Sequence, residues 1–244
     1  MSYFQFRPNY ALTDYIDAYW TARGDKKELT TETILPDGCV DIILNLGENR
    51  TTDDNDLTMK NEGIYLVGTM TRFKKAIMTS ETNLLGIRFK PAAFSAFYQF
   101  SSLHEVTNQT VELDKRFLPD IQKNANNSVP YLNQFFLNKL SRPKHNLFQV
   151  INDVFKHKGQ INLQELALSH FTTLRQLERS FKKYVGISPK EFTNLTRYQF
   201  AASAIRNKSP NQSLLDIAME CGYYDHSHLT NEVKRYTGVL PSQL

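Results

Sequence analysis

The sequence predicts an α+β protein with a β-rich domain over residues 1–143 and an all-helical domain over residues 144–244. Three observations favour this division. Between residues 34 and 90 apolar and polar residues alternate, as in half-buried strands, whereas the spacing after residue 144 is helical throughout. The segment 141–144 separates two helical patterns and is typical of a linker. Basic residues outnumber acidic ones only beyond that linker.

Length and composition describe an ordinary globular chain. Its 244 residues suffice for one or two domains, and 41% hydrophobic with 22% charged residues excludes a disordered or collagen-like protein. The two cysteines, Cys39 and Cys221, are far apart in sequence, which suits a reducing compartment better than a disulfide framework. With neither a leader pattern nor a long apolar stretch, we expect a cytoplasmic protein without a membrane span.

The N-terminal elements follow from their spacing. The turn 36–38 precedes a strand over 40–46 in which Val40 and Ile42 share one face while Asp41 lies on the other. Further strands are predicted over 64–70, 73–79 and 84–89; Pro91 is then placed to open a helix to about residue 100, and a helix is predicted over 129–140. That last helix has apolar residues on several sides, which fits a cap on the sheet, a dimer seam or a contact with the other domain.

Three polar residues of the predicted strands are candidates for binding a small-molecule effector. Asp41 and Asn45 either line the interior of a barrel, or they face solvent or satisfy a turn, and the second reading is favoured. Arg88 alternates with its apolar neighbours and is expected to face outward, although an inward arginine would suit an anionic effector. With one histidine in this half, His104, the sequence predicts no metal site and no cofactor.

The C-terminal domain contains an internal repeat. Shifting it by 52 positions aligns residues 181–189 with residues 233–241, and a shift of 51 aligns Leu166-Ala167 with Ile217-Ala218. A single-residue insertion in a turn is what a duplicated helix-turn-helix would tolerate.

Each copy predicts a short helix, a tight turn and a longer helix. In the first copy Thr173 and Gln176 have the form of a capping box that opens the longer helix. On that helix Leu177 and Phe181 belong to an apolar face, and the opposite face is cationic. The cationic residues of that face are Arg175, Arg179 and Lys182.

The charge of the chain is concentrated in the repeated half. Residues 1–143 carry 16 basic and 17 acidic residues, whereas residues 144–244 carry 13 and 8, a net charge of +5. A charged face on a single helix is most often just solvated. Two equivalent units with matching apolar faces and an excess of positive charge instead predict helices that enter the major groove of double-stranded DNA.

These residues resemble the AraC/XylS family of bacterial transcription regulators, whose DNA-binding domain has about one hundred residues, seven helices and two helix-turn-helix motifs. The family pattern Ser-x-Arg-x-Leu-x-Arg-x-Phe-Lys is present over residues 173–182, with Thr173 in the serine position. The second signature matches at Ile217, Ala218, Gly222, Tyr223, Asp225, Ser227, Lys234, Gly238 and Pro241.

The resemblance implies roles for exposed residues of both motifs. Base contacts are implied for Arg175, Glu178 and Arg179 in the first motif and for Ser227, His228 and Asn231 in the second. Phosphate contacts are assigned to Thr173, Lys182, Lys183, Lys190, Lys234 and Arg235. Because Asn231, Val233 and Leu240 depart from the residues usual in the family, we expect the first motif to carry more of the sequence discrimination.

The N-terminal half is similar to the cupin-like regulatory domain of a subgroup of these regulators, over residues 4–118. The similarity rests on Tyr19-Trp20, residues 35–47, Val67-Gly68 and residues 86–92. The expected function is that of an effector-responsive regulator of transcription, monomeric or homodimeric, with RNA polymerase as an expected further partner. The alternatives are a small-molecule enzyme, or an oligomerisation scaffold, attached to a DNA-binding tail.

Overall fold

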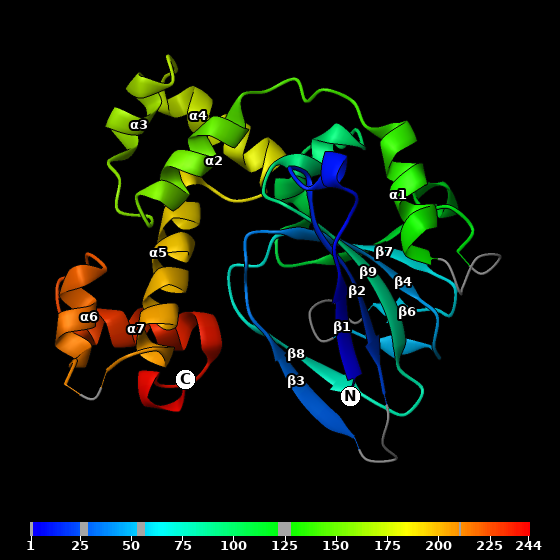
Figure 1. The fold of residues 1–244 in the computed structure, drawn as a ribbon, viewed down its shortest axis with the longest axis horizontal. Helices are drawn as coiled ribbons and strands as arrows, with labels where there is room; N and C mark the ends of the chain where they lie inside the picture. The colour runs from blue at the N-terminus through cyan, green and yellow to red at the C-terminus, as the bar shows by residue number, and fades with distance from the viewer. Residues whose placement is uncertain (1, 25–28, 53–56, 122–127, 210) are drawn as a thin grey trace.

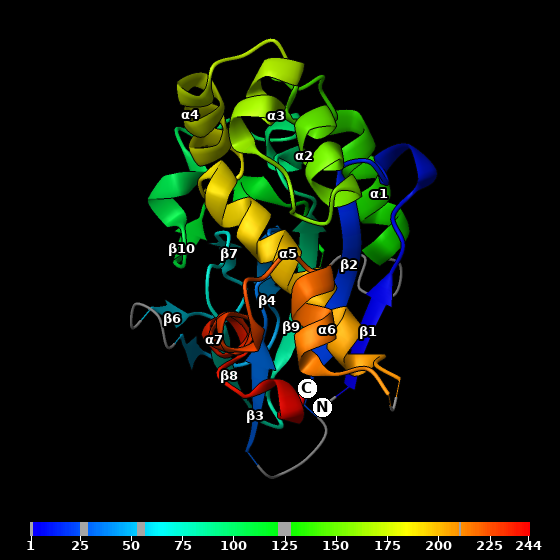
Figure 2. The ribbon, with the colours of Figure 1, turned by 90° about the vertical axis from the view of Figure 1, so that its left-hand side faces the viewer.

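The computed structural model describes residues 2–24, 29–52, 57–121, 128–209 and 211–244. The β-rich part and the helical part lie side by side (Figure 1). After a quarter turn, helices α5, α6 and α7 lie in front of the strands, and α2, α3 and α4 lie above them (Figure 2). The α+β architecture predicted from the alternation and from the helical spacing is confirmed.

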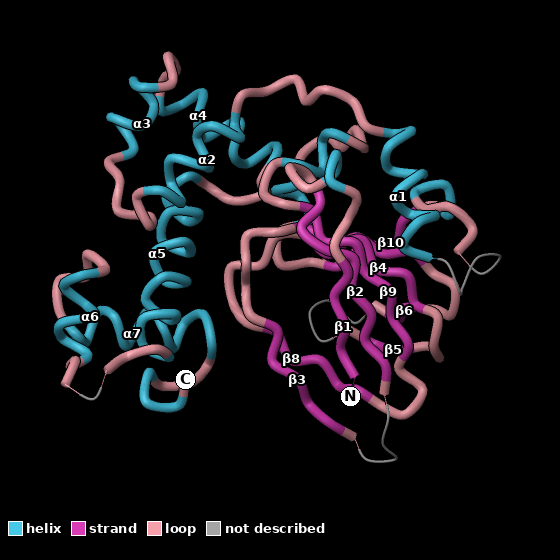
Figure 3. The backbone as a smooth tube through the Cα atoms, viewed as in Figure 1, coloured by secondary structure: helices cyan, strands magenta, loops and turns pink. Residues whose placement is uncertain are grey.

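The N-terminal half is built on an antiparallel six-stranded sheet in the order β1-β2-β9-β4-β7-β10. Two ribbons, β3–β8 and β5–β6, complete an open barrel (Figure 3). The strands span Ser2–Phe6 (β1), Ile16–Arg23 (β2), Thr30–Ile34 (β3), Val40–Asn45 (β4), Arg50–Thr51 (β5), Thr58–Met59 (β6), Ile64–Val67 (β7), Lys74–Met78 (β8), Asn83–Phe89 (β9) and Thr110–Leu113 (β10). The strands predicted over 40–46, 64–70, 73–79 and 84–89 correspond to β4, β7, β8 and β9.

Both faces of the main sheet are covered. Ile42 and Phe89 face a core closed by helix α1 (Ser128–Lys139), whose Phe136 is fully buried against them. The opposite face carries Trp20 and Ile43 in a separate apolar cluster on the barrel side. The helix predicted over 129–140 therefore caps the sheet, which was one of the readings left open by its apolar residues.

The prediction of a helix from Pro91 to about residue 100 is wrong. Only a short 3-10 turn, η2 (Ala93–Ala96), forms there. Ala92 has a φ of 66°, in the left-handed region, so a right-handed helix cannot begin at Pro91 and run through it. The segment is held in place by the packing of its buried aromatic rings rather than by helical hydrogen bonds. Phe94, for example, makes an edge-on contact with Phe89.

The helical half places one long helix between two smaller groups. Helix α5 connects a group of α2, α3 and α4 with a group of α6 and α7 (Figure 1). These helices span Leu147–Lys156 (α2), Leu163–Ser169 (α3), Leu174–Tyr184 (α4), Pro189–Arg206 (α5), Leu214–Glu220 (α6) and His226–Thr237 (α7), and a 3-10 turn over Pro241–Gln243 follows. Among the described residues, these six helices and the 3-10 turn correspond to the seven helices that the family resemblance implies. One core joins both groups, with Phe181 against Phe192 and Tyr198 stacked on Tyr236.

Candidate functional site: two helix-turn-helix units and a barrel cavity

The first helix-turn-helix consists of α3 and α4, and its caps are those that the sequence predicts. The Thr173 hydroxyl accepts a hydrogen bond from the Gln176 backbone nitrogen at 3.2 Å, and the Gln176 side chain accepts one from the Thr173 nitrogen at 3.1 Å. This reciprocal box fixes where α4 begins. Leu177 and Phe181 are buried in the shared core, so the orientation of the helix about its axis is fixed as well.

The exposed face of α4 brings together the residues predicted to contact bases. Arg175, Glu178 and Arg179 are all exposed, and Lys182 continues the same face. Within the described part of the chain, neither arginine side chain makes a hydrogen bond or an ion pair. Their guanidinium groups are therefore free to meet an acceptor outside the protein.

The second unit consists of α6 and α7. The carboxylate of Asp225 caps α7 by accepting a hydrogen bond from the His228 backbone nitrogen at 2.7 Å. Leu229 and Val233 are buried, while Ser227, His228 and Asn231 are exposed together on the opposite side. The predicted contact residues of the second motif thus share one face, as those of the first motif do.

The six residues assigned to phosphate are all exposed, but they differ in what they already contact. The Thr173 hydroxyl is engaged in the capping box, and Arg235 lies 3.6 Å from the Glu232 carboxylate. Lys183 lies over the ring of Tyr184 and lines a hollow shared with aromatic residues of the barrel. Lys183 is consequently at the contact between the two halves rather than on the cationic face of α4. The other assigned residues are Lys182, Lys190 and Lys234.

The C-terminal end of α4 is held by the N-terminal half. Four side chains of that half donate hydrogen bonds to backbone carbonyl oxygens at this end of the helix. These bonds run from Thr69 to Val185, from Ser102 to Lys182 (3.3 Å), and from His104 Nδ1 (2.8 Å) and Thr107 (2.7 Å) to Gly186. The terminal carbonyls that a helix leaves without partners are thereby satisfied across the boundary between the two halves.

A cavity of about 320 Å³ lies inside the barrel, between the main sheet and the β3–β8 ribbon. Asp41 and Arg88 line it, so the expectation that Arg88 faces outward is wrong, as is the favoured solvent-facing reading of Asp41. Trp20, Asp37 and Cys39 also line it, although the sequence analysis did not assign them to effector binding. The remaining surface is mostly apolar, with side chains such as Ile43, Met70, Met78 and Leu84.

The polar cluster in the cavity is centred on Arg88. Its Nε lies 3.3 Å from the Asp37 carboxylate and 3.5 Å from the Asp41 carboxylate, which also accepts a 2.6 Å hydrogen bond from Trp20 Nε1. Burial raises the pKa of Asp41 to about 6, against the opposing effect of Arg88. Burial also raises the pKa of the Cys39 thiol well above its usual range, so this thiol is protonated near neutral pH.

We expect Asp41 to make the stability of the protein dependent on pH. Because its pKa is about 6 in the folded chain against 3.8 for an ordinary aspartate, its contribution is complete below about pH 4 and is lost as the pH rises through 6. Replacing Asp41 with Asn removes this titration. The free energy of unfolding of the unmodified protein, relative to Asp41→Asn, should fall by up to about 3 kcal/mol between pH 4 and pH 7. Parallel pH profiles from urea unfolding would contradict the expectation.

Asn45 does not line the cavity, so its assignment to an effector is corrected. Its side chain is buried, and its polar atoms are hydrogen-bonded to the loops around it. The Nδ2 group donates to the carbonyls of Glu48, Met59 and Lys60, while Oδ1 accepts from the Gly47 nitrogen. The residue is therefore a structural tie between the β4–β5 and β6–β7 loops.

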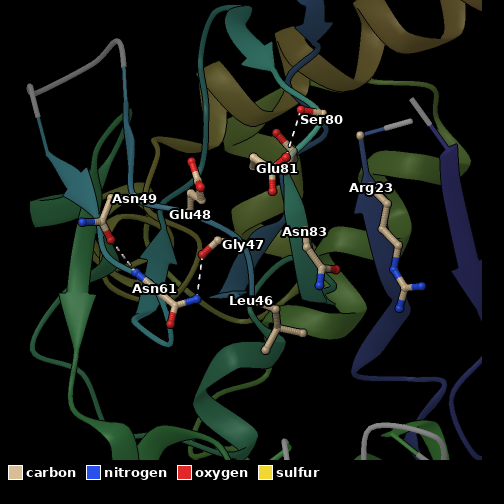
Figure 4. Close-up of a pocket in the computed structure, with 11 residues that line it drawn as sticks. Arg23, Leu46, Gly47, Glu48, Asn49, Asn61, Ser80, Glu81 and Asn83 are labelled. Carbon is tan, nitrogen blue, oxygen red and sulfur yellow. Dashed lines mark hydrogen bonds between the residues drawn. The ribbon is translucent and has the colours of Figure 1, made fainter. Parts of the chain in front are cut away.

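A second, open hollow of about 890 Å³ lies at the C-terminal end of β4 (Figure 4). The Asn61 side chain donates a 2.7 Å hydrogen bond to the Gly47 carbonyl, and Asn49 accepts one from the Asn61 nitrogen at 2.8 Å. Its lining is built from loop backbone and exposed side chains such as Glu48 and Glu81. Its buried lining residue Thr82 already accepts a hydrogen bond from the Thr79 nitrogen at 2.9 Å, so this hollow is a weaker candidate than the cavity.

Two further features bear on function. Across the described ranges, no group of three or more His, Cys, Asp or Glu side chains is placed to hold a metal ion. None of the described helices is long and apolar enough to cross a membrane.

Comparisons with known proteins agree with this geometry. Residues 166–244 match a family described as "Helix-turn-helix domain", and residues 4–112 match a "Domain of unknown function (DUF6597)". The chain is 32% identical over 88 residues to the regulator MtrA of Neisseria gonorrhoeae, covering 36% of this chain and 29% of MtrA. It is 30% identical over 76 residues to the activator RhaS of Klebsiella pneumoniae, covering 31% of this chain and 27% of RhaS.

The chain therefore spans less than a third of the length of these curated relatives. A solved structure of ToxT from Vibrio cholerae is similar over the whole chain. The match has a TM-score of 0.50 at 10% identity and covers 100% of this chain and 97% of ToxT. At this identity the likeness concerns the fold, which is shared across both the barrel and the helical half.

Proposed function

We propose, from the membership of the helix-turn-helix domain in the AraC/XylS family, that the protein is a sequence-specific regulator of transcription that binds double-stranded DNA. One observation carries the proposal. Two equivalent helix-turn-helix units present recognition helices α4 and α7 whose outer faces are exposed, while their inner faces are fixed in one core. Such a pair of helices is suited to reading two successive segments of a major groove.

The two motifs divide the work of recognition. Arg175 and Arg179 can donate in pairs to the acceptors at the edge of guanine, and Glu178 can accept from cytosine. In the second motif Asn231 is suited to adenine, and Ser227 and His228 reach either a base or a phosphate. Lys182, Lys190, Lys234 and Arg235 supply affinity that does not depend on sequence and that weakens with salt.

The N-terminal half is the regulatory part of the proposal. The cavity around Asp41 and Arg88 takes a small-molecule effector, and binding shifts the population between two presentations of the recognition helices. The protein acts without a cofactor and without catalysis of its own, in the cytoplasm. It works as a monomer or homodimer, with RNA polymerase as a further partner.

The proposal is tested by selecting bound sequences from a pool of random DNA duplexes with the full-length chain. We expect an enriched motif with two half-sites about one helical turn apart. Affinity for the selected duplex should fall steeply with salt, by a slope of about 0.9 per phosphate contact. A matched selection with Arg175 and Arg179 both replaced by Ala should lose enrichment in one half-site. Recovery of no enriched motif by the unmodified chain would overturn the proposal.

A further inference from the structure

The walls of the barrel cavity include two of the segments that touch the helical half. The first, segment 35–39, joins β3 to β4, and its residues Asp37 and Cys39 line the cavity. Between them Gly38, with a φ of +80°, lies against α5 so closely that a Cβ there would be 3.1 Å from the ring of Phe192. The left-handed backbone and the close approach both require glycine at this position. A single turn thus faces the cavity on one side and α5 on the other.

The second segment, residues 67–74 between β7 and β8, contacts the ends of both recognition helices. Met70 and Lys74 line the cavity. The Thr69 hydroxyl donates to the carbonyl of Val185, the C-cap of α4. The ring of Phe73 covers Gly238, the C-cap of α7, where a Cβ would be 2.6 Å from it. The cavity is therefore lined by two of the segments that hold the helical half against the barrel.

The cluster in the cavity has one group with unused hydrogen-bonding capacity. Each carboxylate already has partners: Asp37 accepts from the Cys39 nitrogen at 2.9 Å, Asp41 accepts from Trp20, and both face Arg88. The Arg88 guanidinium approaches them through Nε, and within the described part of the chain its two terminal amino groups make no hydrogen bond. A planar fork of this kind matches a carboxylate in a two-point arrangement. Because the group without hydrogen-bond partners is a positively charged donor, the cavity is suited to an anion rather than to an amine.

We propose that the cavity binds a small molecule with an apolar body and a single carboxylate, which pairs with Arg88 in place of Asp37. Releasing Asp37 loosens segment 35–39 from α5 and so changes how the recognition helices are held. A volume of about 320 Å³ is at the small end of ligand sites and fits one aromatic ring with a short chain. This inference rests on the proposed regulatory function, but the binding step can be measured without DNA.

The chain contains a built-in reporter of binding. Trp20 is its single tryptophan and lines the cavity, so fluorescence at this residue reports an occupant directly. The probes are benzoate, phenylacetate and 4-phenylbutyrate, each compared with its amide and with the corresponding amine. We expect at least one carboxylate to shift the Trp20 emission and raise the melting temperature at millimolar concentration, and the neutral and cationic counterparts to do neither. A response to the amines alone, or to no probe, would overturn the proposed ligand class.

Two variants test the role of Arg88. Arg88→Lys keeps the charge but loses the fork, and we expect it to weaken carboxylate binding at least tenfold while the chain remains folded by circular dichroism. Arg116→Lys is the matched control, because Arg116 is exposed on the same domain and pairs with Asp114 at 2.9 Å outside the cavity. Equal affinity of both variants for the carboxylate would contradict the assignment.

The coupling to DNA is tested with Asp37→Asn, which weakens the pair with Arg88 but keeps an oxygen for the Cys39 nitrogen. We expect this variant to change the affinity for the selected duplex by about 5-fold or more, in the direction that the bound carboxylate produces in the unmodified protein. Asp114→Asn is the control, since Asp114 also caps a turn and pairs with an arginine, far from the cavity. Carboxylate binding without any change in DNA affinity would overturn the coupling. A chain that binds carboxylate but no DNA would instead refute the proposed function alone.

Discussion

Replacing Arg179 with Ala should lower the affinity for the selected duplex by about 10- to 100-fold, while the affinity for random duplexes falls only a few-fold. Arg179 is exposed on the outer face of α4 and has no partner among the described residues, so its guanidinium is free to pair with a guanine edge. Each such two-point contact discriminates against the wrong base by about 1–3 kcal/mol. Titration by fluorescence anisotropy, with both duplexes at the same salt concentration, measures the difference.

Two controls separate this effect from a general loss of charge. Lys234→Ala removes one positive charge from α7 and should weaken binding to both duplexes equally, with a salt slope lower by about 0.9. Arg116→Ala removes a charge from the barrel and should leave both affinities unchanged. If Arg179→Ala weakens specific and random binding equally, the residue contacts phosphate and the proposed division of roles is wrong.

Gly86→Ala should destabilise the barrel by about 3 kcal/mol or more. Gly86 pairs across strands with Trp20, whose indole lies where a side chain would be: a Cβ at position 86 would be 1.9 Å from Trp20 Cε2. The central strand β9 cannot move away because β2 and β4 flank it. The indole would therefore leave its place, at the cost typical of overpacking and with the loss of its hydrogen bond to Asp41. Urea unfolding followed by circular dichroism measures the change.

A double-mutant cycle isolates the clash. Trp20→Ala is destabilising on its own, but in its presence Gly86→Ala no longer meets the indole. The double variant should therefore be more stable than the sum of the two single effects implies, by about 1–3 kcal/mol. Additive effects would show that the glycine is needed for another reason.

The helical half was predictable from local sequence to a large extent. The capping box at Thr173 and the apolar faces ending in Phe181 depend on residues a few positions apart, and the structure has them where the spacing predicts. Because the unit is duplicated, the helix pattern predicted for one copy could be compared with that of the other. The strands β4, β7, β8 and β9 were also predictable, because strict alternation identifies a strand whatever it pairs with.

The cavity was not predictable in the same way. Alternation correctly placed Arg88 on the opposite face of the strand from Ile87 and Phe89, but it does not show which face of the sheet meets solvent. Here the apolar face is covered by η2 and α1, and the mixed face is closed off by the β3–β8 ribbon, so Arg88 and Asp41 are turned inward. The place of Trp20 depends on its pairing with Gly86, which involves residues more than sixty positions apart. Asn45 could not be distinguished from a binding residue without knowledge of the loops that it ties together.

The contacts of segment 67–74 have a consequence for the geometry of the whole molecule. Thr69 holds the C-cap of α4, and Phe73, four residues later, packs on the C-cap of α7. The separation and relative tilt of the two recognition helices are therefore set jointly by α5 and by a loop of the barrel. On the proposed function, the barrel therefore serves as a template for the spacing of the two DNA half-sites.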